Sequence, residues 1–143
     1  MTTDTLLAVA HHLAAFSLLA ILAIEWALLR PGITPTQLRF VGKLDAGYGL
    51  SALTVIGVGI ARVMLGPKGH AFYTGNPVFW TKMGVFVAIG LLSIAPTIAL
   101  QKSRRAAPDD AQVAGLRKWL GLQLLLFPLL PIAAALMARG VGH

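Results

Sequence analysis

Two adjacent histidines, His11 and His12, lie inside the first long apolar segment of this 143-residue chain. Burying an imidazole in hydrocarbon is costly, so intramembrane histidines usually face a neighbouring helix, a cavity or a ligand. Neutral histidine is also a common ligand of haem iron and of metal ions. The pair therefore has two explanations, a hydrogen bond to a neighbouring helix or a cofactor site.

Two acidic residues form a second group with possible chemistry. Glu25 lies about one turn from the end of the first apolar segment, and Asp45 enters the second segment just after Lys43. A heptad-like spacing places Glu25 on the same helix face as His11. The two carboxyl groups indicate either a proton path or a structural ion pair with Lys43 or Arg39, and the ion pair is the simpler explanation.

The composition indicates that these residues are positioned inside a membrane. The chain is 57% hydrophobic and 12% charged, which is too little charge for the surface of a soluble domain. It has no cysteine, which excludes disulfides, thiolate metal sites and covalent c-type haem. The net charge of +7 comes from basic residues between apolar segments, a pattern of membrane topology and not of nucleic-acid binding.

Four segments reach the length of about 20 apolar residues that a membrane-spanning helix needs. They are residues 6–29, 46–65, 78–100 and 119–137. Capping and proline signals bound them at Arg30-Pro31-Gly32, Thr34-Pro35-Thr36-Gln37, Asn76-Pro77 and Pro108-Asp109-Asp110. We expect the second helix to begin at the membrane surface, with Leu38, Phe40 and Val41 at the interface. Pro96, Pro128 and Pro131 predict kinks in the third and fourth spans.

The basic residues orient the chain. Most of the 12 lysines and arginines lie after the first and third segments: Arg30, Arg39, Lys43, Lys102, Arg104, Arg105, Arg117 and Lys118. The positive-inside rule therefore predicts that both termini are on the non-cytoplasmic side. The predicted fold is all-α, a single domain over residues 1–143 that forms an up-down-up-down four-helix bundle as a multi-pass protein of the bacterial inner membrane.

This topology places several cationic groups at the depth of the histidines. His12 lies about 9 Å and Lys82 about 8 Å inside the outer ends of their helices, and Arg62 and Arg139 close the outer ends of the other two. A layer that combines possible axial ligands with cations for propionates suits a b-type haem. Snorkelling explains Lys82, and interfacial anchoring explains both arginines, without any ligand.

The second segment is rich in small residues. Gly47, Ser51, Thr54, Gly57 and Ala61 fall on one stripe, which allows the close approach of a neighbouring helix or of a flat macrocycle. Helix packing is the simpler explanation, because such stripes are common in membrane bundles.

Several strings resemble an uncharacterised family of small bacterial predicted membrane proteins, a domain of unknown function. They are Asp45-Ala46-Gly47-Tyr48-Gly49, Lys68-Gly69-His70-Ala71-Phe72-Tyr73, Asn76-Pro77-Val78-Phe79-Trp80-Thr81-Lys82, Leu91-Leu92-Ser93-Ile94-Ala95-Pro96-Thr97 and Met137-Ala138-Arg139-Gly140. The resemblance covers nearly the whole chain and implies a membrane location. It implies no particular activity.

The chain is more distantly similar to the haem-containing protoporphyrinogen oxidase family of bacteria. His12-Leu13 matches that family's histidine–leucine pair, and Trp80-Thr81-Lys82 matches its aromatic helix entry leading to a lysine. The resemblance implies His12 and Lys82 as ligands of haem iron, with His12 and not His11 facing the pocket.

Two functions follow from these observations. The first is a b-type haem protein, a possible haem-dependent oxidoreductase that passes electrons or oxidises a porphyrin-like or quinol substrate. Its cofactor-binding residues are His12, His11, Lys82, Arg62 and Arg139, and its catalytic residues are unknown. The second is a non-catalytic accessory or assembly subunit of a larger membrane complex, or a homo-oligomer. The lipid bilayer is the expected environment in both, and nucleic acid is not an expected partner.

Overall fold

The computed structural model describes residues 2–103 and 105–142, so Arg104, one of the basic residues used to orient the chain, lies outside the described residues. The described residues form six helices and no strand: α1 (Thr3–Leu28), α2 (Pro35–Leu65), α3 (His70–Thr74), α4 (Pro77–Lys102), α5 (Asp110–Leu126) and α6 (Leu129–Ala138). Within these residues, four stretches are long and apolar enough to cross a membrane: α1, α2, α4 and the run Asp110–Ala138.

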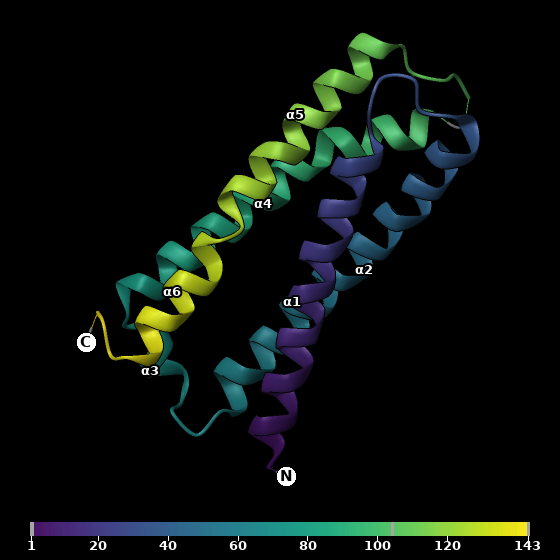
Figure 1. The fold of residues 1–143 in the computed structure, drawn as a ribbon. Coiled ribbons are helices and arrows are strands. Elements are labelled where there is room, and N and C mark those ends of the chain that lie inside the picture. The colour runs from purple at the N-terminus through teal and green to yellow at the C-terminus, as the bar shows by residue number, and fades with distance from the viewer. Residues whose placement is uncertain (1, 104, 143) are drawn as a thin grey trace.

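The spans are arranged as two hairpins (Figure 1). The first hairpin is α1 and α2, and the second is α4 with α5 and α6. We call the end with residues 29–34, 103 and 105–109 the loop end, and the end with residue 2, α3 and residue 142 the terminal end. The hairpins meet mainly where α1 contacts α5 and α2 contacts α4. Figure 1 shows that they diverge toward the terminal end.

One face of α1 supplies much of the core. Leu18, Leu22, Glu25 and Leu29 are buried, at the three- and four-residue spacing that puts side chains on one face of a helix. The other faces carry exposed apolar residues, as do the other spans, which suits helices surrounded by lipid. The face of α1 that carries Glu25 is therefore the face that packs against the other helices.

An arginine and a tryptophan join the two hairpins near the loop end. The Arg117 guanidinium of α5 lies 4.0 Å from the ring centroid of Trp26, and its Nε donates to the Trp26 carbonyl at 3.2 Å. Gly121, one turn along α5, leaves room for the Trp26 indole, which would lie 3.4 Å from an added Cβ. This cation–π contact and hydrogen bond hold α1 against α5.

Each helix start predicted from capping residues is confirmed. Thr34 and Asp109 form capping boxes with Gln37 and Gln112, and the Asn76 side chain accepts from the amide of Val78. These bonds satisfy backbone amides that have no partner inside the helix. The Oδ1 atom of Asp110 also accepts from the Gly32 amide at 3.1 Å, which ties together the two loops of the loop end.

The Asp109 cap provides a first prediction. We expect Asp109→Ala to lower the free energy of unfolding by about 1 kcal/mol, because the first-turn amide of Gln112 loses its acceptor. Denaturation in mixed detergent micelles measures the change. Asp109→Asn is the matched control, since asparagine also caps well, and an equal loss in both variants would contradict a capping role.

The start of α2 differs from the expectation of an interfacial lead-in. Pro35–Leu65 is one continuous helix, and Leu38 and Val41 are buried in the core, while Phe40 is exposed. The prediction of an interfacial position was therefore wrong for Leu38 and Val41. These residues join a core cluster with Leu29, Leu100 and other apolar side chains, so the bundle continues to the loop end.

The prolines affect the spans differently. Pro128 separates α5 from α6, whereas Pro96 lies inside the continuous helix α4. Proline has no N–H, so the carbonyl of Leu92, four residues before Pro96, loses its helical donor. The Nε2 atom of Gln123 donates to this carbonyl at 3.3 Å. A side chain of α5 thus satisfies the backbone group that Pro96 leaves free.

Candidate functional site in the terminal half of the bundle

His11 is the histidine that faces a neighbouring helix. Its ring packs on α2, where Cε1 would lie 3.4 Å from a Cβ added at Gly59, and it interacts with the Val55 backbone carbonyl. Its Nδ1 atom is buried and has no hydrogen-bond partner among the described residues. A buried nitrogen of this kind is costly unless something binds it.

His12 is exposed on the outside of the bundle. Its Nδ1 atom lies 2.7 Å from the Ala8 carbonyl, one turn earlier in the same helix. Adjacent helical residues point about 100° apart, so only one histidine can face α2. The structure therefore places the two histidines in the opposite arrangement to the one the distant resemblance implied.

Two cations lie near His11. Arg62 of α2 and Lys82 of α4 are both partly buried, and the charges of both act on the His11 ring. The charge of Arg62 also acts on Lys82. The Arg62 Nε atom is buried without a hydrogen-bond partner, and in the described part of the chain no carboxylate forms an ion pair with either residue. The cluster of His11, Arg62 and Lys82, which we call the terminal-half cluster, thus has uncompensated positive charge.

Arg139 does not join this cluster. It is the exposed residue that closes α6, and its backbone amide bonds to the carbonyls of Ala135 and Leu136. The layer predicted from depth therefore contains three neighbours, His11, Arg62 and Lys82, while His12 and Arg139 point to the surface. The sequence alone could not predict which way each of these side chains faces.

A pair of carboxyl groups lies closer to the loop end. Glu25 of α1 is 1% exposed, and its carboxyl group interacts with that of Asp45 of α2, which also bonds to Thr97 of α4. Neither Lys43 nor Arg39 forms an ion pair with them in the described residues. The expected structural ion pair is therefore replaced by a contact between the two acids, which we call the carboxyl pair.

A buried tyrosine–glutamine bridge lies beside the carboxyl pair. The Tyr48 hydroxyl donates to Gln123 Oε1 at 3.0 Å, and the Gln123 amide continues to the Leu92 carbonyl of α4. Tyr48 also lies within electrostatic range of Glu25 and Asp45. The amide of one fully buried side chain thus links α2, α4 and α5.

The small residues of α2 have mixed roles. Gly47 of the predicted stripe packs on Ile21 of α1, but Thr54 and Gly57 are exposed, and a Cβ at Gly57 would meet nothing within 4 Å. Gly59, which lies off that stripe, is the glycine against His11. Gly59 follows Gly57 by two residues in the sequence of α2, but the predicted stripe lies on a face that is exposed at Thr54 and Gly57.

The described residues contain no group of three or more histidine, cysteine or acidic side chains that could hold a metal ion. A haem needs only one or two axial ligands from the protein, because the macrocycle supplies the other four. Within the described residues, the terminal-half cluster offers one buried histidine nitrogen and two cationic side chains.

Comparison with known proteins identifies the family. A family model described as a predicted membrane protein, DUF2214, matches residues 3–142. The chain belongs to the DUF2214 family. With its four apolar helices, this DUF2214 protein is a multi-pass membrane protein. No curated protein and no solved structure matches the chain.

Proposed function

We propose that this DUF2214 protein binds a b-type haem in the terminal half of its bundle, in the bacterial inner membrane. The observation that supports this most is the buried Nδ1 atom of His11, which has no partner in the described residues, on a ring within electrostatic range of Arg62 and Lys82. Both termini lie on the non-cytoplasmic side in this proposal, as the distribution of basic residues predicts.

The side chains of the terminal-half cluster are of chemical types that bind haem. His11 offers a nitrogen that no protein group occupies, and Arg62 offers an Nε–H donor that no acceptor occupies. Lys82 would supply a second cation for the propionates or would help to hold the iron. Haem b is an apolar macrocycle with two carboxylates, so it matches apolar helices that carry buried positive charge.

The proposed role of the protein is electron transfer, or oxidation of a porphyrin-like or quinol substrate. A bound haem supplies the one-electron chemistry. The protein itself binds and orients the macrocycle, neutralises its carboxylates through Arg62 and Lys82, and excludes water with the apolar faces of α1 and α2. This class of reaction is what the resemblance of Trp80-Thr81-Lys82 to the haem-containing protoporphyrinogen oxidase family implies, and that resemblance specifies no substrate.

An absorption spectrum tests the proposal. The protein is expressed with a haem precursor, purified in mild detergent and measured in its oxidised and reduced states. We expect a Soret band that shifts on reduction, with haem and protein close to equimolar. A colourless protein that also fails to take up added haemin after purification would exclude haem binding.

Gly59 tests the position of the haem site. We expect Gly59→Leu to remove most of the Soret absorbance, because a Cβ at this position already lies 3.4 Å from His11 Cε1 and a longer side chain must displace the ring. Gly57→Leu is the matched control on the same helix, where a Cβ meets nothing within 4 Å. Equal haem content in wild type and Gly59→Leu would contradict a site at His11.

A role as a non-catalytic accessory subunit is the second candidate. It is supported by the exposed Thr54 and Gly57 on α2, where a further helix from another chain could approach closely. Purification from native membranes tests it. A stoichiometric partner that is lost in Gly57→Leu would support this function, and a single species in both samples would exclude it.

A further inference from the structure

The carboxyl pair lacks the positive charge that two buried carboxylates require. Glu25 is 1% exposed, and its Oε1 atom has no hydrogen-bond partner in the described residues. Among the described residues, the side-chain partners of the Asp45 carboxyl group are Thr97 and Glu25. Moving even one unpaired carboxylate into a low-dielectric interior costs several kcal/mol, and two that touch also repel each other.

Among the residues that the structure describes, the side chains that face the carboxyl pair from the neighbouring helices supply no cation. From α2 the other titratable group is Tyr48, from α4 the polar groups are Ser93 and Thr97, and from α5 the polar group is Gln123. The Arg117 guanidinium of α5 is engaged with Trp26. Bound protons are therefore the remaining way to neutralise the pair.

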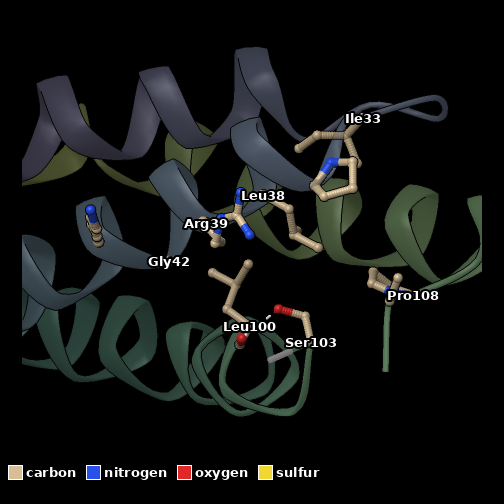
Figure 2. A pocket seen from close by; sticks show the side chains of 10 residues that line it. Ile33, Leu38, Arg39, Gly42, Leu100, Ser103 and Pro108 are labelled. Atoms are coloured by element: carbon tan, nitrogen blue, oxygen red, sulfur yellow. Dashed lines mark hydrogen bonds between the residues drawn. The ribbon is translucent and has the colours of Figure 1, made fainter. Parts of the chain in front are cut away.

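Two adjoining hollows connect this region with the loop end. The loop-end hollow, of about 420 Å³, is bounded by Leu38, Arg39 and Lys43 of α2 and by Leu100 and Ser103 near the end of α4. Figure 2 shows Leu38, Arg39 and Leu100 facing one another around it. The inner hollow, of about 290 Å³, is bounded by Asp45, Tyr48, Ser93 and Thr97.

The hollows share two lining residues, Gly42 and Leu100, so they follow one another along the cleft between α2 and α4. The volumes are many times that of a water molecule, and the inner hollow offers hydroxyl and carboxyl groups to bond it. Gly42 has no side chain to narrow the junction, and a Cβ there would meet nothing within 4 Å.

We propose that Glu25 and Asp45 hold an exchangeable proton that enters and leaves through these two hollows from the loop end. Asp45 lines the inner hollow and receives the proton first. Glu25 does not line this hollow, and it shares the proton through its contact with Asp45. Thr97 positions the Asp45 carboxyl group. The proton-binding site lies on the opposite half of the bundle from the terminal-half cluster, so it does not depend on haem.

Labelling with dicyclohexylcarbodiimide tests the bound proton. This apolar reagent adds to protonated carboxyl groups, and mass spectrometry locates the adduct in the full-length protein in lipid bilayers. We expect an adduct on Glu25 or Asp45 that decreases as the pH is raised, and no adduct there in the double variant Glu25→Gln, Asp45→Asn. Absence of labelling at both residues at every pH would overturn the proposal.

The same experiment distinguishes a proton from a metal cation. At constant pH, sodium chloride and choline chloride of equal ionic strength should leave the labelling equal. Protection by sodium alone would overturn the proton assignment in favour of a sodium site. This comparison uses the wild-type protein, so the result does not depend on the folding of any variant.

Infrared spectroscopy in D₂O tests the route. The carbonyl band of a protonated carboxyl group shifts when its proton is replaced by deuterium. We expect Gly42→Leu to slow this exchange severalfold by filling the junction between the hollows. Gly84→Leu, at an exposed position of α4 outside the hollows, should leave it unchanged. Equal exchange in all three proteins would overturn entry from the loop end.

Discussion

His11→Ala is expected to abolish the Soret band of the purified protein, whereas His12→Ala retains it. The physical reason is the direction of each side chain. The His11 ring packs on α2, with an Nδ1 atom that has no partner in the described residues, and lies within electrostatic range of Arg62 and Lys82. The His12 Nδ1 atom already bonds to the Ala8 carbonyl on the exposed side of α1. Absorption spectra of the two variants at equal protein concentration measure the difference.

These two variants form a matched pair, because each removes one imidazole from neighbouring positions of the same helix. Elution as a single species in size-exclusion chromatography checks that both variants fold. Loss of the Soret band in His12→Ala with retention in His11→Ala would place the haem on the outer surface of α1. That result would contradict the site proposed at the terminal-half cluster.

Gln123→Leu is expected to destabilise the protein by about 2–4 kcal/mol, since it leaves the Tyr48 hydroxyl and the Leu92 carbonyl buried without partners. Pro96 creates the need for this side chain by removing the helical donor to Leu92. In a Pro96→Ala background, the amide of residue 96 can donate to the Leu92 carbonyl. The cost of Gln123→Leu should then fall by about 1–2 kcal/mol.

Unfolding in mixed detergent micelles gives all four free energies of this double-mutant cycle. Gln101→Leu is the control. Gln101 is exposed on α4, and its substitution makes the same change in size and polarity. Additive costs of Pro96→Ala and Gln123→Leu would show that Gln123 does not replace the donor that the proline lacks.

The elements of the fold were predictable because their signals are local. Thr34, Asn76 and Asp109 act on amides within a few residues of themselves, and each starts a helix as expected. The apolar length of each span is likewise a property of consecutive residues. These features need no knowledge of which helix packs on which.

The candidate site was predictable only in part, because it depends on contacts between helices. Depth along the membrane placed His11, Arg62 and Lys82 in one layer, but the choice between His11 and His12 depends on where α2 lies. Lys43 was expected to pair with the acids through proximity in sequence, yet it is exposed and forms no ion pair with them in the described residues. Side-chain direction follows from packing, which a single sequence does not contain.

Leu38 and Val41 illustrate the same limit. Their spacing is that of an amphipathic helix, which suits both a membrane surface and the end of a bundle. Only the neighbouring core residues, among them Leu29 and Leu100, decide between the two positions. The glutamine that satisfies the Leu92 carbonyl is a further case, since Pro96 predicts the free carbonyl but not its distant donor.

The closeness of α1 and α2 has a consequence for the order in which the protein assembles during synthesis. α1 packs more extensively on α2 than on any other element, so the first hairpin can form as soon as residue 65 has been inserted. Glu25 and Asp45 both belong to this hairpin and therefore meet before α4 exists. The Tyr48–Gln123 bond and the tie from Asp110 to Gly32 come last, when the final span arrives. The nascent chain thus acquires its acidic contact early and its links between hairpins at the end.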